Sequence, residues 1–164
     1  MTRSLVTLRT VDLIRLGELA AQDRLDLFTR KPQTGRLYAK RLFAVALCQG
    51  AALHYLDGKN GVKDLDVWNF FTESPERPFP YRRLANIDFG NLRFGVTPDA
   101  PHFIGRRVDI IGRSIPGADP SDPVETLRRY LHAGKTRSAR LLALKAMILI
   151  EPTRLLGTVV WPIQ

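Results

Sequence analysis

The pattern of hydrophobic and polar positions predicts helices at both ends of this chain. Residues 10–30 carry apolar side chains at the three-and-four spacing of a helix face. Gly17 and the charged stretch 23–26 are places where this region would divide into two helices. Residues 123–132 predict an amphipathic helix, and residues 138–150 predict another that is apolar almost throughout. We expect these helices to pack against a sheet formed by the middle of the chain.

The middle of the chain alternates short apolar runs with glycine-rich turns. Residues 42–48 are apolar without alternation, which is typical of a strand buried on both faces. Gly50 follows, and a short helix is expected to begin near Ala51. A turn rich in Gly, Asn and Lys then leads into a second predicted strand over residues 64–71. The pattern therefore predicts a strand, a helix and a strand in close succession.

Two aspartates separated by one residue stand at the start of the second predicted strand. Because successive side chains of a strand point to opposite faces, Asp64 and Asp66 share one face while Leu65 and Val67 point into the core. Two carboxylates on one face repel each other unless positive charge lies between them. Mg²⁺ prefers carboxylate oxygens, so the pair predicts a site for Mg²⁺ or Mn²⁺.

The length and the pattern together predict one domain spanning residues 1–164. Its fold class is α/β (α+β), with a small mixed sheet of roughly four or five strands. We expect the helices on one face of this sheet, over residues 10–30 and 123–150, and an acidic cleft open on the other face. The apolar segment 155–163 would add an edge strand or pack across the helices.

This order of elements resembles the nucleotidyltransferase superfamily, which includes polymerase β, the CCA-adding enzymes and the aminoglycoside nucleotidyltransferases. The resemblance covers residues 41–113: an apolar strand, Gly50-Ala51, twelve residues, and then Asp64-Leu65-Asp66. The superfamily places a third carboxylate on a neighbouring strand, between apolar residues. Asp109 fits that context, and Asp88 is the weaker candidate because Gly90 follows it closely.

The resemblance implies transfer of a nucleoside monophosphate from a nucleoside triphosphate such as ATP to an acceptor hydroxyl. Asp64 and Asp66 would hold two Mg²⁺ ions, and Asp109 would complete the ion that activates the acceptor. The acceptor itself, RNA, protein or a small molecule, is not indicated.

The resemblance also implies a cradle for the triphosphate. The backbone at Gly50 and Ala51 would donate N–H groups to phosphate oxygens, although Ala51 lacks the hydroxyl or glycine that the superfamily usually has at this place. Lys59 and Lys63 would neutralise phosphate charge. Arg107, on the same face as Asp109, would either reach the triphosphate or pair with a carboxylate.

Two alternatives remain open. The Ala51 departure and the small size favour a catalytically weak or silent member of the superfamily that acts as an interaction module, like an antitoxin. The net charge of +9, from 25 Lys and Arg against 16 Asp and Glu, favours a basic domain that binds nucleic acid.

Further features bear on location rather than chemistry. No apolar run is long enough for a membrane span, and charged residues interrupt the N-terminal region where a signal peptide would need an apolar segment. The single cysteine, Cys48, lies in an apolar run and is expected to be a buried side chain rather than a reactive thiol. We therefore expect a cytoplasmic protein without a membrane partner.

Overall fold

The computed structural model describes residues 3–80, 82–97 and 100–163, with the backbone alone for residues 82–86. The helices are α1 (Thr10–Arg30), α2 (Pro32–Tyr38), α3 (Gln49–Asp57), α4 (Pro123–Ala133) and α5 (Arg137–Leu142), with short 3₁₀ turns η1 (Leu92–Phe94) and η2 (Thr153–Leu155). The strands are β1 (Leu42–Cys48), β2 (Leu65–Thr72), β3 (Arg82–Asp88), β4 (Arg107–Ile115), β5 (Met147–Glu151) and β6 (Val159–Trp161).

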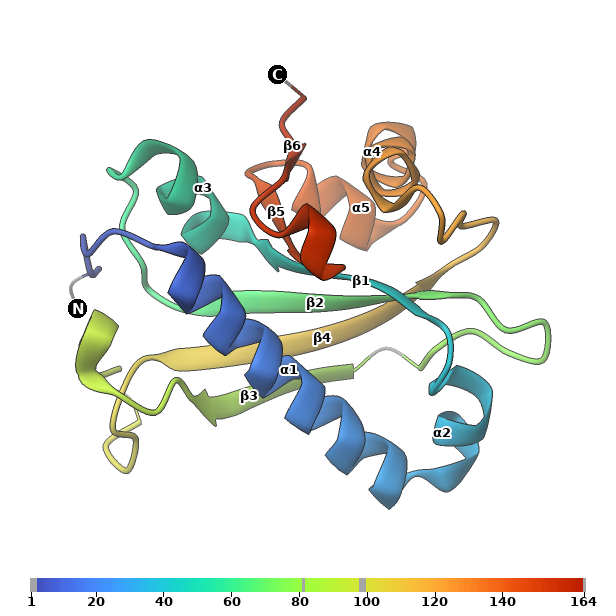
Figure 1. The fold of residues 1–164 in the computed structure, drawn as a ribbon, viewed down its shortest axis with the longest axis horizontal. Helices are drawn as coiled ribbons and strands as arrows, with labels where there is room; N and C mark the ends of the chain where they lie inside the picture. The colour runs from blue at the N-terminus through green and yellow to red at the C-terminus, as the bar shows by residue number, and fades with distance from the viewer. Residues whose placement is uncertain (1–2, 81, 98–99, 164) are drawn as a thin grey trace.

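Within the described residues the strands form one sheet of six, in the order β3-β4-β2-β1-β5-β6 (Figure 1). The β2–β4 pair is parallel, and the other neighbouring pairs are antiparallel. The predicted mixed α/β sheet is thus confirmed. The edge strand β6 confirms one of the two arrangements expected for the C-terminal segment.

Helix α1 is continuous through the two places where a break was expected. At its start the Asp12 carboxylate accepts a hydrogen bond from the backbone N–H of Arg9 at 2.8 Å. This bond satisfies a backbone donor that has no acceptor within the helix. Gly17 is fully inside the helix, and a Cβ there would lie 2.9 Å from Cγ2 of Ile150. Gly17 therefore serves the close approach of α1 to β5, and it does not end the helix.

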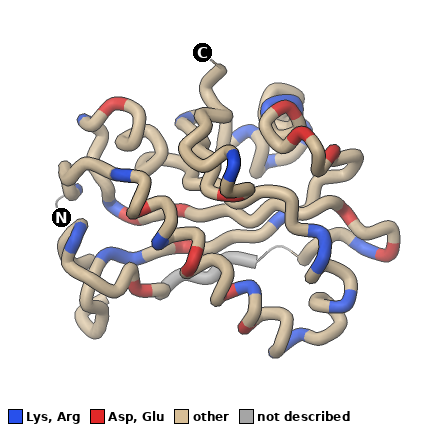
Figure 2. The backbone as a smooth tube through the Cα atoms, in the orientation of Figure 1, with Lys and Arg blue, Asp and Glu red and all other residues tan. Residues whose placement is uncertain are grey.

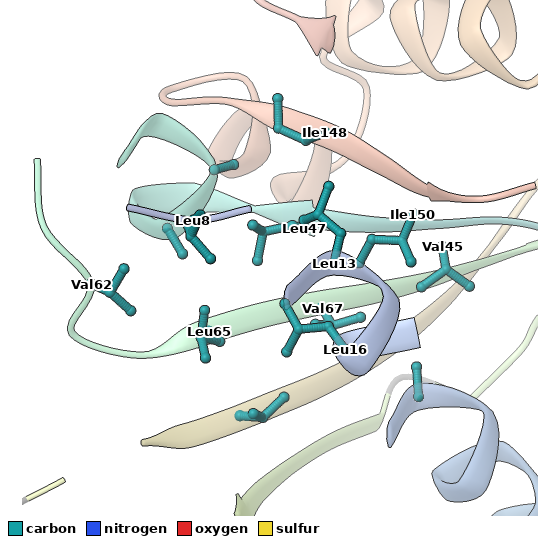
Figure 3. Packing of buried hydrophobic residues seen from close by; sticks show 14 of the residues in the cluster. Leu8, Leu13, Leu16, Val45, Leu47, Val62, Leu65, Val67, Ile148 and Ile150 are labelled. Atoms are coloured by element: carbon teal, nitrogen blue, oxygen red, sulfur yellow. The ribbon is translucent and has the colours of Figure 1, made fainter. Parts of the chain in front are cut away.

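Helices cover both faces of the sheet, not one face as the sequence predicted. On one face, Leu13 and Leu16 of α1 pack against Val45, Val67 and Ile150 from three strands (Figure 3). On the other face, Leu127 of α4 and Leu142 of α5 join a second cluster. Figure 1 shows α1 running across the near face, with α4 and α5 grouped near the top of the view. The cavity that Asp64 and Asp66 line is also lined by Leu141 of α5, so these residues do not lie on a helix-free face.

The prediction of a helix over residues 138–150 is wrong. The helix α5 ends at Leu142, and the buried run that follows is the strand β5, which pairs antiparallel with β1. Met147, Ile148 and Leu149 are fully buried because both faces of this strand are covered. A short apolar run with both faces buried has no periodicity that separates a strand from a helix.

Residues 32–35 begin helix α2, with Pro32 at its first position, where the missing N–H costs nothing. Across the described part of the chain, no helix has the length and apolar character that crossing a membrane requires.

Candidate functional site

Parallel pairing of β2 with β4 brings two of the predicted carboxylates side by side. Asp66 is the register partner of Asp109, and one step further along the same face Trp68 is the partner of Ile111. Trp68 and Ile111 both belong to the core cluster beneath α4 and α5, so Asp66 and Asp109 point to that face. Asp64 lies one residue before β2 and shares this side by alternation.

A cavity of about 410 Å³ opens beside this part of the sheet. The predicted residues Asp64, Asp66, Gly50, Ala51 and Lys63 all line it. Its other lining residues are Gln49 and Trp68, which are close in sequence to this set, and the distant Arg3, Ile111, Leu141 and Lys145. Acidic, basic and apolar side chains therefore meet around one space, as a site for a charged ligand with an apolar portion requires.

Gly50 lies where basic groups converge. A Cβ at this position would lie 3.2 Å from Nδ2 of Asn60, 3.6 Å from Nη1 of Arg3 and 3.7 Å from Nζ of Lys145. Asn60 also donates a hydrogen bond to the Gly50 carbonyl at 3.1 Å, which fixes the backbone there. Glycine at this position leaves room for the two cations beside the cavity.

Arg107 contacts an aspartate and does not line the cavity. Its Nε lies 3.8 Å from Oδ1 of Asp64, and both side chains are mostly buried. The sequence allowed Arg107 either to reach a triphosphate or to pair with a carboxylate, and this structure has the pair. The positive charge of the guanidinium partly offsets the negative charge of Asp64.

Asp109 is more deeply placed than the other two aspartates. Its side chain is only 1% exposed and lies outside the cavity lining, at the position next to Asp66. The alternative residue, Asp88, serves the backbone: its carboxylate accepts hydrogen bonds from the N–H groups of Ile104 and Gly105 at 2.7 and 2.8 Å. Burial alone would raise the pKa of Asp88, but these bonds and one from Gly90 lower it below its ordinary value. Of the two candidates, only Asp109 lies beside Asp66.

Lys59 is also outside the cavity lining. It belongs to the exposed turn after α3, where its backbone N–H donates to the Asp57 carboxylate at 2.7 Å. Asp57 thus stabilises the turn. Lys63 is the predicted lysine that the fold brings to the site.

Arg3 and Lys145 were not expected at the site, and the fold brings both to Gly50. Lys145 was expected within a helix, but it stands between α5 and β5, two residues before the buried strand. A single lysine in a long apolar run was the available signal. Arg3 reaches the site through an N-terminal segment that pairs with the chain before β2, through Ser4 and Val62.

Cys48 is buried, and its chemistry indicates no catalytic role. Burial raises the pKa of its thiol well above the ordinary value, and the charge of Asp66, its partner across β1 and β2, raises it further. The thiol stays protonated and packs as a small apolar side chain, as expected.

The donor set fits a metal ion held by two carboxylates. Asp64 and Asp66 line the same cavity, and Oδ1 of Asp64 is a buried oxygen that accepts no hydrogen bond from the described residues. Carboxylate oxygens suit Mg²⁺, which usually keeps waters and substrate phosphates as its other ligands. A set of three is not assembled: in the described ranges, no three His, Cys, Asp or Glu side chains are grouped to hold a metal ion.

Comparison with known proteins assigns this chain to no family. No family model, no curated protein and no solved structure matches this chain.

Proposed function

We propose that this chain is a metal-dependent nucleotidyltransferase, which moves a nucleoside monophosphate from a nucleoside triphosphate to an acceptor hydroxyl. The observation that carries the proposal is the parallel register of Asp66 with Asp109, beside Asp64 and a cavity that also holds Arg3 and Lys145. Carboxylates next to convergent cations suit a triphosphate bound with a divalent metal.

In the proposed reaction, the acceptor oxygen forms a bond to the α-phosphorus of the triphosphate. The bond from that phosphorus to the α,β-bridging oxygen breaks, and pyrophosphate leaves with the electron pair. Lys145, Arg3 and Lys63 would bind the charged phosphates, and the backbone at Gly50 leaves space for them. Asp109, the register neighbour of Asp66, would receive the proton of the acceptor hydroxyl.

Asp64 and Asp66 are the residues that would hold Mg²⁺ or Mn²⁺. A divalent ion bound by them would draw charge from the phosphates and orient the triphosphate. The cytoplasm supplies nucleoside triphosphates and Mg²⁺, so we propose that the protein acts there.

Thermal unfolding tests the donor part of this proposal. With Mg²⁺ and ATP at a hundredfold excess over Kd, binding would add about 2.7 kcal/mol and raise Tm by roughly 5–10 °C. Asp64→Asn/Asp66→Asn should remove the rise, whereas Asp119→Asn, in the loop before α4, should keep it. The proposal fails if none of the four ribonucleoside triphosphates stabilises the wild-type protein in the presence of Mg²⁺ or Mn²⁺.

A second function is favoured by a specific observation. The Arg107–Asp64 contact and the absence of three grouped carboxylates in the described residues would also suit a member of this superfamily that has lost catalysis and binds a protein partner. Such a protein would capture its partner equally well with and without Mg²⁺, and the double aspartate substitution would not weaken the capture.

Nucleic acid is a third class of partner, but the distribution of Lys and Arg over the fold does not indicate one binding surface for it. Figure 2 shows Lys and Arg along much of the fold, not gathered on one element. RNA therefore enters our proposal as one of the three acceptor classes, beside protein and small molecules. Binding to RNA through the basic surface would weaken steeply with salt and would not depend on Asp64 or Asp66.

A further inference from the structure

Gln49 has a backbone conformation that side chains avoid. Its φ is +63°, in the left-handed region, and no other non-glycine residue in the described ranges has a positive φ. Residues other than Gly, Asn and Asp rarely adopt this conformation, and such outliers concentrate at functional sites. Gln49 is the first residue of α3 and lines the cavity that holds Asp64 and Asp66.

The neighbouring glycine shows that the turn alone does not explain Gln49. Glycine would relieve the left-handed conformation at position 49, yet the chain has its glycine at position 50. There the backbone is not left-handed, but a Cβ would lie 3.2 Å from Nδ2 of Asn60. Glycine thus stands where space is short, and a long polar side chain stands where the backbone is strained. The side chain of Gln49 therefore stands at a position where it carries a conformational cost.

The carboxamide of Gln49 makes no hydrogen bond to any described residue, although the side chain is half-buried. Its backbone is held firmly, because the N–H of Gln49 donates to the carbonyl of Ala146 at 3.1 Å. The residue before it, Cys48, is the register partner of Asp66, so Gln49 lies just beyond the end of β1 next to the acidic pair. A fixed backbone and an unused carboxamide suit a contact with a ligand.

Charge around Gln49 selects the ligand chemistry. Nη1 of Arg3 and Nζ of Lys145 both lie within 4 Å of the Cβ position at the next residue, Gly50. Two cations at this distance favour an anion, and the carboxamide adds two N–H donors. The oxygens of a phosphate group can accept hydrogen bonds from Arg3, Lys145 and the carboxamide of Gln49.

We propose that Gln49 is a substrate-binding residue whose carboxamide donates hydrogen bonds to the phosphate oxygens of the triphosphate donor. This inference rests on the proposed function. It adds one phosphate contact, made by a residue whose backbone is in the left-handed region. Stability and binding should then respond in opposite directions to one substitution, which a merely structural residue would not produce.

The test measures Tm and calorimetric affinity for two probes, Mg²⁺·tripolyphosphate and Mg²⁺·ATP. Gln49→Gly should raise Tm by roughly 2–4 °C, because glycine relieves the left-handed conformation, and should lower the affinity for both probes about tenfold. Gln49→Leu keeps the bulk and the conformational cost, so its Tm should stay near the wild-type value while both affinities fall. Gln22→Leu is the matched control, since Gln22 contacts Asp26 on α1 outside this cavity and should bind as the wild type does.

Three results would overturn the inference, and they separate it from the proposed function. Wild-type affinity for both probes in Gln49→Gly and Gln49→Leu would show that Gln49 does not bind the donor, while the proposed function would stand. Loss of affinity for ATP alone would replace the phosphate contact with a contact to the nucleoside. If the wild-type protein bound neither probe, both the inference and the proposed donor site would be wrong.

Discussion

Asp66 and Asp109 are direct neighbours in the parallel pair β2 and β4, although they stand 43 positions apart in sequence. Antiparallel strands joined by a short turn would place such residues close together at little topological cost. A parallel pair needs a long connection, and here the connection includes the edge strand β3. The fold thus brings two carboxylates to one face of the sheet beside the cavity.

The first prediction concerns Asp109. Asp109→Asn should lower the rate of nucleotide transfer by on the order of a hundredfold or more, because the amide cannot accept the acceptor proton. Donor binding should persist, since Asp109 lies outside the cavity lining. Rate and donor affinity are measured on the same preparation by transfer assay and calorimetry. An unchanged rate with full donor binding would exclude Asp109 from the chemistry.

The second prediction concerns the space at Gly50. Gly50→Val should weaken the binding of Mg²⁺·ATP by at least about tenfold, or about 1.4 kcal/mol, because its side chain would displace Asn60, Arg3 or Lys145. Gly117→Ala is the control: Gly117 has φ +69° in a distant loop, with nothing within 4 Å of a Cβ. The control should lose about 1 kcal/mol of stability and keep its affinity. Equal affinities in both variants would contradict a ligand site at Gly50.

The third prediction concerns the pair formed by Arg107 and Asp64. Arg107→Met should strengthen the binding of Mn²⁺ in the absence of nucleotide, by up to about fivefold, because the guanidinium no longer competes for the carboxylate. Electron paramagnetic resonance of free Mn²⁺ measures this affinity. Arg36→Met removes an exposed pair with Glu76 and should leave the affinity unchanged. Weaker Mn²⁺ binding in Arg107→Met would be the opposite of what this contact implies.

The fourth prediction concerns acid stability and the role of Asp88. Its folded-state pKa is lowered, so its ionised form stabilises the fold above the unfolded pKa of about 3.9. This contribution is lost as the pH falls from about 4 through the lower folded pKa. Asp88→Asn should be less stable than the wild type at pH 7, and urea unfolding should show the difference shrinking toward pH 3. A difference that stays constant with pH would mean that the charge of Asp88 does not stabilise the loops.

The central elements could be predicted from sequence because their signals are local. The apolar run before Gly50 and the alternation around Asp66 each define an element within a few residues, and β1, α3 and β2 were expected at nearly these bounds. The apolar context of Asp109 also indicated a strand, and the resemblance implied that it neighbours the strand of Asp66; in the structure β4 does pair with β2.

The remaining parts depend on contacts between distant residues. The strand β5 resembled a helix because burial on both faces removes periodicity, and only pairing with β1 decides between the two. The positions of Arg3 and Lys145 beside Gly50 follow from that pairing and from the N-terminal segment, so no local pattern places them together. The left-handed conformation of Gln49 likewise has no sequence signal, since glutamine is not a residue that favours it.

Transfer of label tests the central claim most directly. The purified protein would be incubated with Mg²⁺, cell lysate as the source of acceptors, and each of the four α-³²P-labelled ribonucleoside triphosphates. The account predicts label on an acceptor with the wild type and none with Asp64→Asn/Asp66→Asn, and nuclease or protease treatment of the product would assign the acceptor class. Label transferred equally by the double variant would contradict the account, and so would the absence of transfer from all four triphosphates.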